Sequence, residues 1–523
     1  MRELPIGVQD FGMLRRNNLL YVDKTARLLE LIKNGRRYFL SRPRRFGKSL
    51  TLSTLEAMFS GKSELFSGLL AEGWVEEQSK EFIPVLRFDM SAREFSTVEL
   101  FYDSLKIMIS RSARRFSVRL SSNILSDMLD ELLENLNERY GNVVILIDEY
   151  DKPILDNITN FDKAQELREI LRTFYTALKS CDEYLRFVFI TGISKFSKIG
   201  VFSAMNNLLD ISLLEQYGDV TGYTQEELEY NFAEWIDFIA EKKQQDREEI
   251  LSGLKDYYDG FSFDGVTRLY NPYSILSFFV SREFNNYWYE SGSPSFIVEW
   301  MKAHKIQSPE EYRHKVVRND FISSQEIEHA DASSFLFQSG YLTIESKEGY
   351  LLTLDYPNRE VLDSISSMYL NLVYKIDGYA LLGNEIWKAL MEGDIPEVVR
   401  LYNVALSGIP YDDYVRNRNE YWYRSMFVML LRGAGIISYS EPHTSKGCVD
   451  VVIQFNDLVV VLEFKFAINS SEIEEKKREG LKQVEDRGYA KSYNREGRKI
   501  ISAVLVADDE QRQLIIRKFC VRC

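Results

Sequence analysis

Cysteine and histidine are both scarce in this sequence of 523 residues, which contains four of each. Four scattered cysteines cannot build a disulfide framework, and no two histidines have the spacing of zinc ligands on one helix. Apolar runs stay well below the roughly 18 residues that a membrane-spanning helix needs. The first residues also lack the apolar segment of a secretory signal. We therefore expect a cytoplasmic protein that has no membrane partner and is not a histidine-based zinc enzyme.

The length is too great for one hydrophobic core, and the composition excludes a disordered or collagen-like chain. Hydrophobic residues make up 45% of the sequence and charged residues 28%, as in globular proteins. Changes of pattern along the chain predict three parts. They are an α/β domain over residues 1–221, a helical, aromatic and acidic region over 222–405, and a second α/β domain over 406–523.

The negative net charge is unevenly distributed, so it does not exclude nucleic acid as a partner. The total is −14, yet residues 1–50 carry +8 and residues 476–523 carry +6, which leaves −28 for the segment between them. Local basic surface is what phosphate binding requires, and both ends provide it. Ordinary solvated faces would give the same pattern.

Short apolar runs alternate with helical stretches in the first 221 residues, which predicts a parallel sheet covered by helices. One helix is expected to start at Lys48 and to end near Ser60, because apolar residues recur there at helical spacing. The predicted strands are Tyr38–Ser41, Val85–Asp89, Val143–Ile147, Arg186–Thr191 and Leu208–Ile211.

The segment between the first strand and that helix is similar to the phosphate-binding pattern G-x-x-x-x-G-K-[ST]. Gly47, Lys48 and Ser49 fit the pattern, whereas Arg42 replaces its first glycine. A loop that runs into a helix N-terminus directs backbone N–H groups at phosphate oxygens. Lys48 would then reach the β- and γ-phosphates of ATP, and Ser49 would hold Mg²⁺. The alternative is a helix that merely starts with basic residues.

Two acids end the most apolar strand, and we expect them to complete a nucleotide site. Asp148 and Glu149 stand where ligands bind in open parallel sheets. Asp148 is predicted to contact Mg²⁺, and Glu149 to activate water. The next strand leads to Thr191 and Ser194, which are placed to sense the γ-phosphate. Capped strand ends are the structural alternative.

These segments resemble the AAA-ATPase-like family of bacterial and archaeal proteins. The resemblance implies a P-loop NTPase sheet that binds ATP and Mg²⁺. It also implies that a loop without the first glycine binds nucleotide, with Arg44, Arg45 and Phe46 as parts of the loop. The two arginines either contact phosphate or only make the loop basic. The motifs that carry the resemblance are Leu4–Gly7, Tyr21–Thr25, Arg42–Ser49 and Asp148–Pro153.

A second constellation lies on strands that are predicted in the last domain. Asp450 is expected within the strand Val449–Ile453, and Glu463 and Lys465 lie on the strand Leu458–Lys465 after a turn. Residues two apart project from one face of a strand, so this pair can meet Asp450. The two carboxylates would bind Mg²⁺, and the lysine would stabilise developing charge. An exposed, salt-bridged strand face would give the same pattern.

The order of these three residues resembles that of the PD-(D/E)XK nucleases, and the resemblance extends over about residues 415–495. It implies a restriction-endonuclease-like α/β domain that cleaves nucleic acid with Mg²⁺ or Mn²⁺. It adds Glu420, on the opening helix, as a further metal ligand. It also adds Gln483, on a later helix, as a catalytic residue near the metal. Arg424 stands where many relatives have histidine.

The region 222–405 carries no catalytic constellation. Its aromatic turns at Tyr257–Phe261 and Tyr270–Tyr273 recur in the proteins that this chain resembles. They either stack nucleic-acid bases or pack domains together.

Together the two constellations predict an ATPase whose nucleotide state gates a metal-dependent nuclease acting on DNA. The alternative is a nucleotide-switched regulatory or scaffold protein, whose nuclease-like domain binds nucleic acid or protein without cleaving. A homo-oligomer is compatible with either function.

Overall fold

The computed structural model describes residues 1–91, 96–157, 160–195, 207–290, 297, 301, 308–322, 331–373, 379–409, 418–440, 443–444, 447–455, 458–487 and 499–522. The chain forms two compact units. The first unit comprises Met1–Phe296 and His314–Glu360, and the second comprises Ile297–Arg313 and Val361–Cys523. The two units are defined by packing alone. The division into three domains, with boundaries at residues 221 and 405, therefore stays a prediction.

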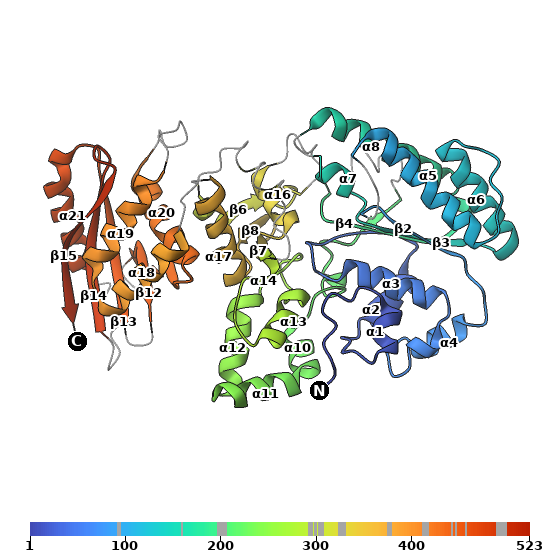
Figure 1. Cartoon of the computed structure of the whole chain (residues 1–523), viewed down its shortest axis with the longest axis horizontal. Coiled ribbons are helices and arrows are strands. Elements are labelled where there is room, and N and C mark those ends of the chain that lie inside the picture. The colour runs from blue at the N-terminus through green and yellow to red at the C-terminus, as the bar shows by residue number, and fades with distance from the viewer. Residues whose placement is uncertain are drawn as a thin grey trace. The chain divides into compact units, whose positions relative to one another are not determined.

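The first unit begins with an α/β segment in which strands and helices alternate (Figure 1). Its elements are α1 (Phe11–Arg16), α2 (Thr25–Asn34), β1 (Arg37–Ser41), α3 (Lys48–Phe59), α4 (Glu72–Gln78), β2 (Val85–Asp89), α5 (Val98–Arg115), α6 (Leu125–Tyr140), β3 (Val143–Asp148), α7 (Lys152–Leu155), α8 (Phe161–Ser180), β4 (Leu185–Gly192) and β5 (Leu209–Asp210).

All five strands are parallel and follow the order β2-β3-β4-β1-β5. Figure 1 shows α1–α4 on one face of this sheet and α5–α8 on the other. Since both faces are covered, every residue of β3 is buried, and this explains its uninterrupted apolar sequence. The predicted parallel sheet is confirmed. β4 separates β1 from β3, so the phosphate loop and the acids Asp148 and Glu149 follow strands that are not neighbours.

The remainder of the first unit is mostly helical and includes a small antiparallel sheet of order β6-β8-β7 that the sequence did not predict. Its elements are α10 (Gln225–Asn231), α11 (Ala233–Lys243), α12 (Arg247–Tyr258), α13 (Pro272–Ser281), α14 (Tyr287–Glu290), β6 (Lys315–Arg318), α16 (Ala332–Ser339), β7 (Thr343–Glu348) and β8 (Leu351–Asp355), followed by the start of α17 (Arg359–Met368).

The aromatic turns of this region serve packing within the first unit. Tyr258, Phe261 and Tyr270 are all fully buried. Tyr258 and Tyr270 belong to an apolar cluster that α10–α13 share, and the ring of Phe261 packs edge-on against Phe46 at 4.9 Å between centroids. Buried rings are not available to stack on a base, so the packing interpretation holds for these three residues.

The second unit contains most of α17 and then a mixed sheet with helices against it. Its further elements are α18 (Tyr379–Glu392), α19 (Ile395–Ser407), α20 (Glu420–Gly433), β9 (Ser438–Ser440), β10 (His443–Thr444), β11 (Gly447–Cys448), β12 (Val451–Gln454), β13 (Leu458–Ala467), α21 (Ile473–Arg487), β14 (Lys499–Asp508) and β15 (Gln513–Arg522). A π-helical turn, Tyr369–Val373, follows α17.

The main sheet of the second unit has the order β15-β14-β13-β12-β9, in which only β13 and β14 run parallel. Successive side chains of β13 alternate between two helices. The ring of Phe464 packs against Phe427 of α20, whereas Lys465 approaches Gly480 of α21. β13 is therefore buried on both faces along most of its length.

The strand that was predicted to start at Val449 starts later. Asp450 does not lie within a strand, because β12 starts at Val451 and Asp450 occupies the bend before it. Its side chain accepts a hydrogen bond from the backbone N–H of Phe464 on β13 (2.7 Å). The pairing of β12 with β13 ends at this point. The side chain of Asp450 accepts the N–H of Phe464 there, in place of a backbone carbonyl of a neighbouring strand. The predicted turn at Asn456-Asp457 lies outside the described residues.

None of the helices in the described ranges combines the length and apolar character that crossing a bilayer requires.

Gly260 marks a close approach of two backbone segments in the first unit. Its φ is +103°, and a Cβ atom there would lie 2.1 Å from the carbonyl oxygen of Pro357. We expect Gly260→Ala to destabilise the first unit by about 2–4 kcal/mol, because backbone strain and a backbone clash add. Gly349 is the matched control: its φ is +61°, and no atom of the described residues lies within 4 Å of the added Cβ. Gly349→Ala should cost only about 1 kcal/mol. Denaturant unfolding measures both, and equal costs would contradict the close approach.

Candidate functional site

The loop between β1 and α3 has the backbone of an anion-binding site. Gly47, immediately before α3, has a left-handed φ of +85°, and Arg45 is also left-handed, at +65°. Gly47 is the N-cap residue of α3, and it has no side chain that could cap the first turn. The leading N–H groups of a helix have no partner within the helix. Here they are left to an anion, as a phosphate-binding loop requires.

Lys48 is buried in the first turn of α3, with 6% of its surface exposed. Its Nζ donates to the carbonyl oxygens of Arg42 and Pro43, each at 2.8 Å. Burial lowers the pKa of Lys48, whereas Glu149 and Asp148 oppose that shift. The lysine is therefore held by neutral carbonyls of its own loop while two carboxylates face it.

Asp148 ends β3 and is almost completely buried. Its Oδ1 accepts a hydrogen bond from the hydroxyl of Thr191 on β4 (2.8 Å). Its Oδ2 lies 3.7 Å from Nη2 of Arg87 on β2. Arg87 also reaches the backbone carbonyl of Ser49 (3.5 Å) and Glu56 (3.7 Å). Thr191 thus lies beside Asp148 and holds it, and Arg87 links Asp148 to α3.

The two acids after Asp148 have different environments. Glu149 adopts a left-handed φ of +49°, and burial raises its pKa, with Lys48 opposing the shift. Asp151 is 1% exposed. It accepts hydrogen bonds from the N–H of Ile193 (3.0 Å) and from both the N–H (2.6 Å) and the hydroxyl (2.8 Å) of Ser194. Ser194 therefore fixes the loop that follows Glu149 and does not point away as a separate sensor.

Arg42, which replaces the first glycine of the pattern, is an internal brace. Its side chain is 1% exposed and lies over the ring of Phe263, 4.2 Å from the centroid. It donates to the carbonyl oxygens of Ser41 (3.0 Å) and Ser212 (2.7 Å). The Arg42 side chain is occupied by these contacts. It therefore stabilises the start of the loop from inside the protein.

The other predicted residues of the loop lie on different sides of it. Phe46 is buried against Phe261 and Phe263, so only its backbone is available to a nucleotide. Arg45 is exposed and lies over the ring of Tyr273, 4.7 Å from the centroid.

Arg44 is half-buried, and its carbonyl accepts a hydrogen bond from the indole of Trp288 (3.2 Å). Ser49 is half-buried at the second position of α3.

A cavity of about 70 Å³ opens beside the loop, at the first turns of α3. It is lined mainly by apolar and aromatic groups, with a lysine at its side. Lining residues include Pro5, Tyr21, Lys24, Gly47, Thr221 and Tyr223. The motifs near Leu4 and Tyr21 therefore come together with the loop, although they are distant from it in sequence.

In the second unit, both oxygens of Asp450 are engaged. Oδ1 accepts a hydrogen bond from Nη1 of Arg424 on α20 (2.8 Å), and Oδ2 accepts the N–H of Phe464 (2.7 Å). The side chains of Arg424 and Asp450 are only 10% and 15% exposed. This buried ion pair neutralises a carboxylate that was predicted as a metal ligand.

Glu463 and Lys465 meet in the interior as predicted. Lys465 Nζ donates to Glu463 Oε1 (2.8 Å) and to the carbonyl of Phe464 (2.9 Å). Burial, reinforced by the charge of Asp450, raises the pKa of Glu463 to about 7. Glu463 Oε2 is buried and has no hydrogen-bond partner among the described residues. An orphaned carboxylate oxygen in a buried acidic site is suited to a divalent cation.

The two remaining predicted residues lie on helices beside this group. Glu420 opens α20, and burial raises its pKa while the charge of Lys465 opposes the shift. The carboxylate is thus close enough to Lys465 and Asp450 to interact electrostatically. Gln483 is half-buried on α21, one turn after Gly480, where that helix approaches Lys465.

The sequence interpretation missed two arginines and the role of one acid. Arg87 interrupts the apolar pattern of β2, and a charge within a buried strand could have identified it. Arg424 was recognised only as an unusual residue, because its contact with Asp450 spans 26 positions. Asp151 belonged to a quoted motif, but its three hydrogen bonds depend on how β3 and β4 end.

Two segments of the chain match known protein families. Residues 5–202 match a family described as predicted AAA-ATPase, and residues 418–516 match the PD-(D/E)XK nuclease superfamily. An uncharacterized protein in the vnfD 5′ region of Azotobacter chroococcum is 34% identical over 512 residues, or 95% of each chain. The chain belongs to the same family as this Azotobacter protein. The predicted AAA-ATPase with a P-loop NTPase sheet and the C-terminal restriction-endonuclease-like domain are thus confirmed.

Solved structures add little to the family assignment. The ORC1 protein of Aeropyrum pernix, in complex with DNA, is 11% identical, with a TM-score of 0.23 over 66% of this chain and 92% of its own. The ORC2 protein of the same organism, in ADPNP–ADP complexes, is 12% identical, with a TM-score of 0.26 over 66% and 88%. Both TM-scores are low, so these structures are only distantly similar to this AAA-ATPase family member.

The raised pKa of Glu463 makes the stability of the metal-free nuclease-like unit depend on pH. The folded state binds a proton more tightly than the unfolded state, in which the pKa of this group is near 4.5. The protonated carboxyl therefore favours folding fully below pH 4.5, and that contribution is lost as the pH rises through 7. Relative to Glu463→Gln, we expect the wild type to lose on the order of 2 kcal/mol between pH 5 and pH 8.

Urea unfolding in the presence of EDTA, at several pH values, measures this difference. Glu485→Gln is the matched control, because Glu485 is exposed on α21 of the same unit. Its profile should run parallel to that of the wild type. A parallel profile for Glu463→Gln as well would show that Glu463 titrates normally.

Proposed function

We propose that this protein binds and hydrolyses ATP in its N-terminal domain and cleaves phosphodiester bonds of DNA in its C-terminal domain, with the nucleotide state gating cleavage. One observation carries the nuclease activity. Asp450, Glu463 and Lys465 converge in a buried site in which Glu463 Oε2 has no partner among the described residues. A purely structural ion-pair cluster would satisfy that oxygen.

The nuclease residues have distinct roles in this proposal. Glu463, Asp450 and Glu420 would hold Mg²⁺, for which Mn²⁺ can substitute. The ion would supply an activated hydroxide and screen phosphate charge. Lys465 stands beside Glu463 and carries an N–H group that can stabilise the developing negative charge. Gln483 would orient the nucleophile from α21.

The ATPase residues also have distinct roles in this proposal. Lys48 would exchange the carbonyls of Arg42 and Pro43 for phosphate oxygens, because a charged partner is stronger than a neutral one. Ser49 and Asp148 would hold Mg²⁺. Thr191 would keep Asp148 in place. Glu149, whose raised pKa makes it a better base, would accept a proton from the attacking water.

The basic and apolar groups around the loop would bind the rest of the nucleotide. Arg44 and Arg45 would contact phosphate from the same chain, together with the backbone N–H groups of Phe46 and Gly47. The cavity beside Gly47 offers apolar and aromatic surface to the base.

A chain of hydrogen bonds supports gating. Trp288 donates its indole N–H to the carbonyl of Arg44 in the phosphate loop (3.2 Å) and its backbone N–H to Oε1 of Glu360 (2.7 Å). Glu360 is fully buried and also accepts the hydroxyl of Ser274 (2.7 Å). It is the last residue of the first unit and lies in the first turn of α17, whose later residues belong to the second unit. A shift of the loop on nucleotide binding would therefore pull on the start of that helix.

Cleavage of circular and linear DNA by the purified protein tests the proposal, with Mg²⁺ or Mn²⁺ and with or without ATP. We expect Lys465→Ala to abolish cleavage while ATP binding is retained. Lys48→Ala should weaken ATP binding by at least about tenfold and remove the dependence of cleavage on ATP. Lys482→Ala is the matched control, because Lys482 is exposed on α21.

Absence of cleavage on DNA and RNA in every nucleotide state, with ATP still bound, would overturn the nuclease proposal. It would favour the regulatory or scaffold protein. A specific observation speaks for that second candidate: Arg424 forms an ion pair with Asp450 at 2.8 Å and neutralises its charge. The protein would act in the cytoplasm in both cases, and ultracentrifugation with and without ATP measures whether it forms a homo-oligomer.

Arg424 should set the metal affinity of the nuclease site. A divalent cation must share Asp450 with the guanidinium or displace it, and both cations repel each other. We therefore expect Arg424→Gln to tighten Mn²⁺ binding by about tenfold, or ~1.4 kcal/mol. Titration calorimetry of the nucleotide-free protein measures this affinity.

Arg418→Gln is the matched control, because Arg418 is also paired with an aspartate of this unit, Asp509, at 2.7 Å. It should leave Mn²⁺ binding unchanged. Weaker Mn²⁺ binding by Arg424→Gln would show instead that the arginine positions Asp450 for the metal.

A further inference from the structure

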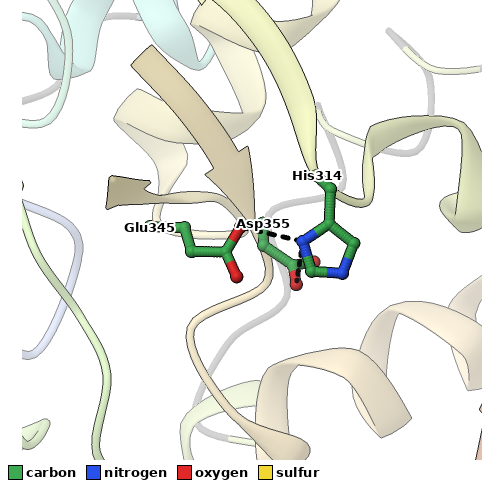
Figure 2. A group of neighbouring side chains, drawn as sticks. All are labelled: His314, Glu345 and Asp355. Carbon is green, nitrogen blue, oxygen red and sulfur yellow. Dashed lines mark hydrogen bonds and ion pairs between the residues drawn. The ribbon is translucent and has the colours of Figure 1, made fainter. Parts of the chain in front are cut away.

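Three metal-ligating side chains meet on the small sheet β6-β8-β7 of the first unit (Figure 2). His314 immediately precedes β6, Glu345 lies in β7, and Asp355 is the last residue of β8. Figure 2 shows one nitrogen of the imidazole ring joined by dashed lines to both carboxylates. None of the three belongs to the nucleotide site or to the nuclease site described above.

The donor atoms have the spacing of ligands that share one ion. His314 Nδ1 lies 2.8 Å from Glu345 Oε2 and 3.6 Å from Asp355 Oδ2. All three donor atoms lie within 4.8 Å of one another. Two ligands at about 2.1 Å from a tetrahedral ion are roughly 3.4 Å apart. Small side-chain rotations would therefore complete the coordination.

The backbone brings these side chains together before any ligand binds. The pairing of β7 with β8 shifts register between Ile344 and Ser346, so Glu345 is the extra residue of a β-bulge. Bulges redirect a side chain out of the regular alternation. The bulge is clamped by Arg268, whose guanidinium donates to the carbonyl oxygens of Ile344 and Glu345.

The other two ligands are also fixed. Lys315 pairs with Leu354 across β6 and β8, which places His314 next to Asp355. His314 has a left-handed φ of +49°, a conformation that few residues other than glycine adopt. Asp355 Oδ1 accepts the N–H of Tyr356 (2.8 Å), which leaves Oδ2 directed at the imidazole.

The chemistry of the donors selects the class of ion. One imidazole nitrogen and two carboxylate oxygens suit a borderline divalent ion such as Zn²⁺, whereas Mg²⁺ prefers oxygen ligands alone. The side chains of His314 and Glu345 are 61% and 41% exposed. Solvent can therefore reach the site, and water would complete the coordination shell.

We propose that His314, Glu345 and Asp355 form a binding site for a divalent transition-metal ion of the Zn²⁺ type. The position of the site gives the ion a consequence. His314 is the residue at which the chain re-enters the first unit, and Asp355 lies five residues before the chain leaves it again after Glu360. A bound ion links these two segments and stabilises the sheet that anchors them.

Equilibrium dialysis of the full-length protein against Zn²⁺, with excess Mg²⁺ present to occupy oxygen-only sites, tests the proposal. We expect His314→Ala to lose one equivalent of bound Zn²⁺ and Glu345→Gln to weaken that equivalent at least tenfold. Glu348→Gln is the matched control, because Glu348 is exposed at the end of the same strand, and it should bind as the wild type does. Circular dichroism confirms that each variant is folded.

Asp450→Asn separates this site from the proposed nuclease centre. The equivalent that depends on His314 should persist in Asp450→Asn, whatever becomes of DNA cleavage. Equal Zn²⁺ binding by the wild type and His314→Ala would overturn the proposal and leave an ordinary ion pair between His314 and Glu345. Loss of the same equivalent in Asp450→Asn would also overturn it, because the Zn²⁺ would then belong to the nuclease centre.

Discussion

Charged side chains that are buried in the protein interior are the constraint on which both proposed active sites depend. Removing a charge from water costs several kcal/mol unless a partner replaces the water. Lys48, Asp148, Glu463 and Lys465 are each less than 10% exposed. Each one accordingly has a partner from its own chain. Contacts within the chain therefore set the geometry of both sites. Any phosphate or cation that binds must compete with these contacts.

The two sites meet this constraint in similar ways. Lys48 rests on the carbonyls of Arg42 and Pro43, and Lys465 rests on Glu463 and the carbonyl of Phe464. Neutral carbonyls are weaker partners for an ammonium group than phosphate is, so Lys48 is held in place but can exchange its carbonyl partners for phosphate. Among these charged groups, only Glu463 Oε2 has no partner among the described residues. A bound cation would therefore stabilise this oxygen more than it would any of the other groups.

Trp288 and Glu360 of the first unit connect the phosphate loop with the chain that leads into the second unit. Trp288 bonds to the loop through its indole and to Glu360 through its backbone. Because Glu360 is buried, moving it away from Trp288 would break a hydrogen bond to a buried carboxylate, which is costly. Such a bond would make the proposed coupling stiff. The proposed zinc site on β6-β8-β7 would hold the segments at which the chain enters and leaves the first unit, by an interaction that is separate from the Trp288–Glu360 bond.

The sequence by itself determined the parallel sheet, the loop before α3 and the pairing of Glu463 with Lys465, because each depends on local pattern: an apolar strand, a motif of adjacent residues, or alternation along one strand. Tertiary structure alone decided which residues satisfy the buried charges. The pairs Arg424–Asp450, Arg87–Asp148 and His314–Asp355 join residues that are 26 to 61 positions apart. Such contacts depend on strand order and register, and on a bulge at Glu345 that no periodicity marks. The position of Asp450 before β12 has the same origin, because the N–H that ends the pairing comes from Phe464 on another strand.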